Sequence, residues 1–343
     1  MMTLKMPNNN GVQYFKNETF SDEDYVQNGK ITPLGIKYLL QFKRFNLFNK
    51  ASTAIIFFIS LPITIPLAIL RFVLLFVVFG TGTLLKKHLS ISLDNYPKII
   101  NIIYFVCLGV YIKSKGKEQI STPSGTDSKN ADRCTVIVSN HNARFDALLL
   151  SNLHQSDSTY LAAAKSSFFG RLLINSGLGS RSMEDGIALD TKEGREEWRR
   201  RLSSAYYRSM LFFPEGRVVN KPNTIMTFQN HLFLGQKVNI ICKKSFYKSY
   251  FLDHTQIEIP FFKAPYSKLN NKTFWDSMIE VTPFFISFVT VFQTEVIGTV
   301  KLNGNETLEE INESLYSLYF ANGYSLVNLD QLLVKKLMQS LYL

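Results

Sequence analysis

The sequence predicts an α/β fold in which a mainly buried sheet is flanked by helices and preceded by an N-terminal membrane hairpin. From residue 134 onward, short apolar runs of strand length alternate with stretches of helical spacing, which is typical of α/β proteins. Before that point, residues 53–85 form the strongest apolar segment, with Arg71 as its only charged residue. These two observations divide the chain into a membrane-seeking part and a globular part.

Residues 1–50 are polar and rich in asparagine, and become mildly amphipathic near Tyr38 to Phe48. We expect a polar tail followed by an interfacial helix. About fifty polar residues precede the apolar segment, and no short apolar stretch lies near Met1, so we expect no cleavable signal peptide.

Residues 51–88 are expected to form the hydrophobic membrane hairpin. A helix rises about 1.5 Å per residue and a bilayer core is about 30 Å thick, so the segment is too long for one upright span and short for two. Pro62 and Pro66 are expected to break the helix, and flanking basic residues favour leaving both ends in the cytosol. A single span at 67–85 and a buried core helix are the alternatives. The flanking basic residues are Lys43, Arg44, Lys50, Lys86 and Lys87.

Residues 89–133 are expected to contain an interfacial helix and a linker. The apolar stretch Ile99 to Ile112 is too short to span a bilayer, so we expect it to lie at the interface or to pack on the domain; Lys113 and Lys115 close it. Residues 113–133 are dominated by Lys, Ser, Thr, Gly and Asp, which is typical of a linker.

The globular domain is expected over residues 134–305, followed by C-terminal helices over 306–343. Apolar runs predict strands, and residues 284–301, dense in β-branched and aromatic residues, predict one or two more. The expected strands are 134–139, 159–163, 210–213 and 238–242, and the expected helices are 145–153, 165–175 and 191–208.

The composition is basic and apolar at once. Lys and Arg number 38 against 27 Asp and Glu, a formal net charge of +11, and hydrophobic residues reach 46%. A basic surface suits anionic lipid headgroups and the phosphates of coenzyme A. Nucleic acid would suit it too, but the chain has no zinc-finger spacing, no RNA-recognition signature and no long Lys/Arg tract, so we expect no nucleic-acid partner.

Cysteine and histidine usage predicts no metal site. Cys107, Cys134 and Cys242 have no paired spacing, so we interpret them as reduced thiols of a cytosolic domain. Four histidines have no spaced acidic or cysteine partners: His88, His154, His231 and His254.

The most informative motif is Asn140-His141 followed by Asp146, directly after the apolar run 135–138. It places an imidazole and a carboxylate just after the end of a strand that is expected to be buried. The histidine there can take a proton from a hydroxyl group, while the carboxylate fixes its tautomer and stabilises the positive charge that develops. That is the chemistry of acyl transfer from a thioester to an alcohol. The simpler interpretation is a turn histidine and an N-cap aspartate.

A second motif, Phe213-Pro214-Glu215-Gly216, follows another short apolar stretch. A strand followed by Pro-Glu-Gly is typical of a carboxylate-bearing loop at a sheet edge. The basic helix expected at 191–208 could meet coenzyme A or headgroups, although pairing with Glu193, Glu196 and Glu197 is the simpler interpretation.

Together the two motifs resemble the first and third signature blocks of the glycerolipid acyltransferase family. The resemblance implies that His141 and Asp146 form the catalytic pair. It also implies acyl-CoA as co-substrate, a lysophospholipid or glycerol phosphate as acceptor, and no bound cofactor. The residues that it implies for substrate binding are Asn140, Glu215, Gly216, Arg217 and Arg181.

The chain departs from the family pattern at three places. Arg217-Val218-Val219 stands where the family continues Thr-Arg-Ser, no apolar run precedes Arg181, and residues 238–242 contain no proline. The overall layout resembles a branch of monotopic proteins of the endoplasmic reticulum and lipid droplets. That branch acts chiefly as a scaffold for ubiquitin-dependent degradation, so protein partners of that machinery are implied. It normally adds a ubiquitin-binding CUE module, which we do not expect here.

Overall fold

The computed structural model describes the following parts of the chain: residues 51–91, 93, 96–115, 133–142, 146–154, 158–159, 172, 175–178, 192–203, 209–215, 223–249, 285 and 288–327, and the backbone of four residue pairs near the N-terminus. These pairs form two antiparallel ladders, β1 (Lys5–Met6) with β2 (Gln13–Tyr14) and β3 (Val26–Gln27) with β4 (Lys30–Ile31). The interfacial helix expected near Tyr38 to Phe48 lies outside the described residues.

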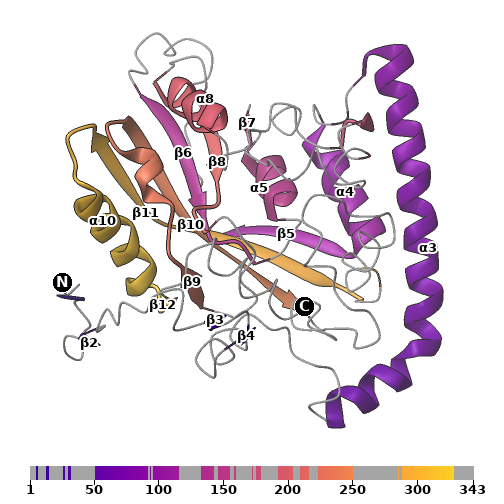
Figure 1. Cartoon of the computed structure of the whole chain (residues 1–343). Helices are drawn as coiled ribbons and strands as arrows, with labels where there is room; N and C mark the ends of the chain where they lie inside the picture. Colours follow the sequence, from indigo (N-terminus) through magenta and orange to yellow (C-terminus); the bar gives the residue numbers. More distant parts are fainter. Residues whose placement is uncertain are drawn as a thin grey trace.

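A mixed six-stranded sheet forms the centre of the fold (Figure 1), with strand order β5-β11-β10-β6-β8-β7. Strands β10, β6, β8 and β7 run parallel to one another, β11 runs antiparallel to β10, and β5 runs parallel to β11. The α/β prediction is confirmed. The strands are β5 (Val110–Lys115), β6 (Cys134–Ser139), β7 (Ser158–Thr159), β8 (Ser209–Phe212), β10 (Lys237–Ser249) and β11 (Thr290–Asn303).

Helices cover both faces of the sheet because the strand side chains alternate between two apolar clusters. Val136 and Val138 of β6 belong to one cluster, and Ile137 between them belongs to the other. This is the period-two alternation of a strand that is buried on both faces. The first cluster includes residues of α8 (Lys192–Leu202) and α10 (Leu308–Ala321), and the second includes residues of α3 (Ala51–Leu89), α4 (Pro97–Leu108) and α5 (Asp146–His154).

The C-terminal part adds a helix and a short strand to this core. Helix α10 begins with a capping box, in which the Thr307 side chain accepts from the Glu310 backbone N–H and the Glu310 side chain accepts from the Thr307 backbone N–H. Strand β12 (Ser325–Val327) then pairs in parallel with β9 (Thr224–Met226). Only a helical ending was expected, so β12 is a correction within the described residues.

Most predicted elements of the globular part are present with shifted ends. The expected strands 134–139 and 210–213 correspond to β6 and β8, and the expected strand 238–242 extends to Ser249 in β10. Residues 160–163 and most of 165–175 lie outside the described residues. Residues 284–301 contribute one strand, β11, which begins at Thr290.

Helix α4 ends at Leu108 and leads into a strand. Gly109 adopts the left-handed conformation (φ 66°) and its N–H bonds to the carbonyls of Phe105 and Tyr104, a common helix C-terminus. The next residues form β5, the edge strand beside β11. The apolar stretch 99–112 therefore packs on the domain, as a helix up to Leu108 and as a strand from Val110, because the left-handed glycine turns the chain into the sheet.

The segment expected to form a hairpin is one helix. Helix α3 contains 39 residues and passes through both prolines, and it bends in its N-terminal half, where the prolines lie (Figure 1). A proline removes one backbone hydrogen bond and kinks a helix, whereas a reversal of direction needs several non-helical residues. Within α3, Phe58–Leu89 is long and apolar enough to cross a membrane.

Helix α3 presents one face to the domain and the other to its surroundings. Leu75 and Phe79 are buried in the core, whereas Ile59 and Ile63 on other sides of the helix are 73% and 62% exposed. Arg71 is also buried, and its Nη1 and Nη2 donate to the carbonyls of Phe285 and Phe288 at 3.0 and 2.6 Å. These bonds tie the helix to the segment that leads into β11.

Candidate active site

The predicted histidine and aspartate lie where a parallel strand gives way to a helix. Strand β6 ends at Ser139, His141 follows in the loop, and Asp146 is the first residue of α5. The carboxyl ends of neighbouring parallel strands lie at the same edge of a sheet, which is the usual place for sites in α/β proteins. Residues 143–145 between the two side chains lie outside the described residues.

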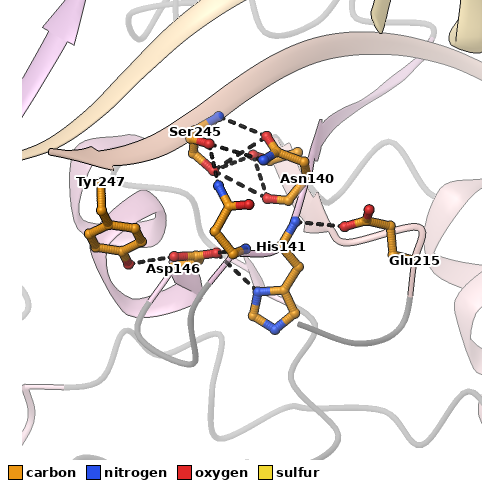
Figure 2. A network of polar contacts seen from close by, with 8 residues as sticks. Asn140, His141, Asp146, Glu215, Ser245 and Tyr247 are labelled. Atoms are coloured by element: carbon orange, nitrogen blue, oxygen red, sulfur yellow. Dashed lines mark hydrogen bonds and ion pairs between the residues drawn. The ribbon is translucent and has the colours of Figure 1, made fainter. Parts of the chain in front are cut away.

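His141 and Asp146 form a hydrogen-bonded pair (Figure 2). The imidazole Nδ1 lies 3.1 Å from Asp146 Oδ2, and the same oxygen accepts the Asn142 backbone N–H at 2.5 Å. An ionised carboxylate only accepts hydrogen bonds, so Nδ1 is the donor. Nε2 then carries the lone pair that can take a proton from a hydroxyl group.

The imidazole is held on its face as well as at Nδ1. The Phe213 ring stacks on it with centroids 4.4 Å apart and planes inclined by 28°. The His141 side chain remains 13% exposed, whereas that of Asp146 is fully buried. Among the described residues, no hydrogen bond to Nε2 is found. The pair therefore has a buried orienting acid and a partly accessible base.

Asn140 fixes the loop that carries His141. Its side-chain Nδ2 donates to the Ser245 carbonyl at 2.9 Å, and its Oδ1 accepts the Ser245 N–H at 2.8 Å. The Asn142 side chain also donates to the Ser245 carbonyl. Asn140 is 1% exposed, so this arrangement favours a positioning role for it over contact with a substrate.

Glu215 lies just after β8 and is fully buried. Its two carboxylate oxygens accept the backbone N–H groups of His141 at 2.7 Å and Met226 at 3.0 Å. Burial raises the pKa of Glu215 to about 8; the two backbone donors oppose that shift and the charge of Asp146 adds to it. Both oxygens of the Glu215 carboxyl group are bonded to backbone N–H groups, and one of these bonds holds the backbone of His141 in place.

Tyr247, on β10, completes the surroundings of Asp146. Its hydroxyl donates to Asp146 Oδ1 (Figure 2), the oxygen that does not face His141. Burial raises the pKa of Tyr247 well above its usual value, and the charge of Asp146 and their hydrogen bond act in the same direction. The phenol therefore stays protonated and remains a donor.

The structure brings four of the predicted site residues together: His141, Asp146, Asn140 and Glu215. The other three, Gly216, Arg217 and Arg181, lie outside the described residues. Three neighbours were not singled out from the sequence as site residues: Phe213 for its stacking, Ser245 and Tyr247. Ser245 and Tyr247 lie about a hundred positions from the motif, and no spacing rule links them to it.

Local contacts test one other hypothesis from the sequence, that of a basic face on α8. On α8, Glu197 accepts from Arg200 at 2.6 Å and Arg201 at 2.5 Å, and these bonds lower the pKa of Glu197 to about 2. Part of the basic face is therefore paired within the helix, as the simpler interpretation had it. In the described part of the chain, no three His, Cys, Asp or Glu side chains cluster closely enough to hold a metal ion.

A His–Asp pair lies at the carboxyl ends of the parallel strands of this α/β sheet. Residues 112–238 match the family model described as Acyltransferase. The match begins in β5, ends in β10 and includes His141, Asp146 and Glu215. The chain therefore carries an acyltransferase-family domain.

One solved structure extends the comparison beyond this stretch. The 1-acyl-sn-glycerophosphate (LPA) acyltransferase PlsC from Thermotoga maritima is similar to 76% of this chain over 95% of its own length, with 13% identity and a TM-score of 0.48. A comparison with curated proteins gave no match.

Proposed function

We propose that this protein is an O-acyltransferase that moves an acyl group from acyl-CoA to the hydroxyl of a lysophospholipid or glycerol phosphate. The observation that carries the proposal is the 3.1 Å contact between His141 Nδ1 and Asp146 Oδ2. It leaves Nε2 as a base in a loop that the family match includes.

In the proposed reaction, His141 Nε2 takes the proton of the acceptor hydroxyl as its oxygen attacks the thioester carbonyl. A carbon–oxygen bond forms and the carbon–sulfur bond breaks. The imidazolium then returns the proton to the departing coenzyme A thiolate. Asp146 stabilises the imidazolium charge, which exists only during the reaction. No bound cofactor is needed, because acyl-CoA supplies the activated acyl group.

The acceptor phosphate is proposed to meet the loop after β8. By resemblance, Glu215 and Gly216 seat the acceptor, and Arg217 or Arg181 neutralises its phosphate. The bonds of Glu215 to the backbone of His141 and Met226 favour an indirect contribution, in which Glu215 shapes the loop and the arginines carry the charge.

We propose a membrane location for the domain, at the endoplasmic reticulum and the lipid-droplet monolayer, with both termini cytosolic. The outer faces of α3 and α4 support it, because they expose large apolar side chains such as Ile59, Ile63 and Ile102. Lys86, Lys87 and His88 form the basic end of α3, which suits anionic headgroups. Flotation with liposomes and with isolated droplets tests the location.

The test of the enzyme proposal is transfer of labelled acyl-CoA to a panel of lysophospholipids and glycerol phosphate by detergent-purified protein. Transfer by the wild type that is lost in His141→Ala supports the proposal and identifies the acceptor. Absence of transfer to every acceptor, from protein shown to be folded and lipid-bound, contradicts it.

The second candidate function is a scaffold that links lipid droplets to ubiquitin-dependent degradation. It is favoured by the resemblance of the layout to the ancient ubiquitous protein 1 branch and by Arg217-Val218-Val219 in place of the family's Thr-Arg-Ser. Proximity labelling on droplets with wild type and His141→Ala tests it. Capture of degradation components by both proteins, without acyl transfer by either, supports the scaffold; their absence from both contradicts it.

A further inference from the structure

Strand β10 extends well beyond the strand beside it. Its parallel pairing with β6 ends at Lys243 opposite Ser139, but β10 continues to Ser249. The loop with the His–Asp pair crosses this overhang. The Ser245 backbone, which has no further β6 residue to pair with, bonds instead to the side chains of Asn140 and Asn142. The extended end of β10 thus fixes the position of the loop through these hydrogen bonds.

Tyr247 lies two residues further along the same overhang, and strand geometry returns it to the face of Ser245. From there its hydroxyl reaches Asp146 Oδ1 (Figure 2). The phenol ring is held by the Phe292 ring of β11, with centroids 5.0 Å apart. A rigid strand pair, rather than the loop itself, therefore sets the position of this hydroxyl.

We propose that Tyr247 is a positioning residue for acyl transfer, which locks the Asp146 carboxylate so that Oδ2 holds His141 with Nε2 as the base. The inference rests on the proposed function and deepens it. Tyr247 acts through Asp146 and is not expected to touch the substrates.

Both oxygens of Asp146 accept hydrogen bonds. Oδ2 serves both Asn142 N–H and His141 Nδ1, and Oδ1 serves Tyr247. The carboxylate is fully buried, so removal of the phenol hydroxyl leaves an anionic oxygen without that donor. A buried carboxylate then gains by turning Oδ1 toward the Asn142 and His141 donors. Rotation of the carboxylate moves Oδ2 and loosens the imidazole.

The test compares Tyr247→Phe with Tyr104→Phe. Tyr104 offers a matched control because its hydroxyl also makes one buried hydrogen bond, to the Leu178 carbonyl at 3.2 Å, away from the pair. We expect kcat of Tyr247→Phe to fall roughly tenfold with KM within about twofold of the wild type. Tyr104→Phe should retain the wild-type kcat. Equal kcat values for Tyr247→Phe and the wild type would overturn the inference.

The second readout does not depend on activity. In protein labelled with ¹⁵N-histidine, the His141 resonances, assigned with His141→Ala, report which ring nitrogen carries the proton. The wild type and Tyr104→Phe should show the proton on Nδ1, and Tyr247→Phe should show a mixture of tautomers or a lost Nδ1–H signal. An unchanged spectrum in Tyr247→Phe refutes the inference. If the wild type transfers no acyl group, the proposed function fails while this spectrum still decides whether Tyr247 orders the pair.

Discussion

The buried carboxylate of Glu215 accepts the backbone N–H of His141 at 2.7 Å, so the acid of the second motif supports the histidine of the first. The two motifs are 74 positions apart and meet because β6 and β8 are neighbouring parallel strands. A residue whose family role suggests contact with substrate is here bonded to backbone through both oxygens.

Glu215→Gln is expected to change how stability depends on pH. Burial raises the pKa of Glu215 to about 8 from its ordinary 4.5, so between these values the folded protein holds a proton that the unfolded chain has released. The contribution of this group to the free energy of unfolding therefore falls as pH rises through that window. The stability of wild type relative to Glu215→Gln should decrease from about pH 5 to about pH 8. Denaturant unfolding at both pH values measures it; a constant difference would contradict the shift.

Asp146→Asn is expected to reduce kcat by about 10² to 10⁴-fold. The amide can donate to Nδ1 and so favour the tautomer with the proton on Nε2, where it blocks the base. Steady-state kinetics with the preferred acceptor measure the loss. Glu193→Gln, on the exposed face of α8, is the control and should keep the wild-type rate. Retention of full activity by Asp146→Asn would exclude the His–Asp mechanism.

Phe213→Leu is expected to reduce kcat by roughly tenfold, because the ring that stacks on His141 at 4.4 Å is lost. Phe212→Leu provides the matched control, since the neighbouring side chain points to the other face of the sheet and packs with Trp198 and Phe233. Both changes should lower stability by about 1 kcal/mol, measured by denaturant unfolding. Equal kcat values for the two variants would show that the stacking has no role in catalysis.

Arg71→Met is expected to loosen α3 from the domain. The carbonyls of Phe285 and Phe288 lose a charged donor, and the loss at the buried Phe285 carbonyl costs about 1–3 kcal/mol. Gly109 permits the contact, since a Cβ there would lie 2.5 Å from Arg71 Nη2.

Limited proteolysis in detergent and thermal unfolding measure this effect. Arg71→Lys retains a charge but cannot span both carbonyls as the planar guanidinium does, so its stability should lie between those of wild type and Arg71→Met. If Arg71→Met is as stable as the wild type, the two hydrogen bonds of Arg71 do not contribute to the stability of the protein.

The local pattern of the chain was sufficient to predict β6, β8 and α8, because each carries its own periodic signal. It was not sufficient to predict β5 (Val110–Lys115), because this strand depends on its pairing with β11, which is distant in the sequence. The hairpin prediction failed for a related reason. Two prolines allow a break, but whether the helix kinks or reverses depends on what its faces contact, and Arg71, Leu75 and Phe79 contact the domain.

The sequence by itself determined the class of fold, the apolar segment and the identity of the His141–Asp146 pair, because these depend on periodicity and on residues close together in the chain. Only the tertiary structure decided what orients the pair. Glu215, Ser245 and Tyr247 reach it from β8 and β10, and contacts between distant segments depend on strand order and register, which short-range patterns do not specify.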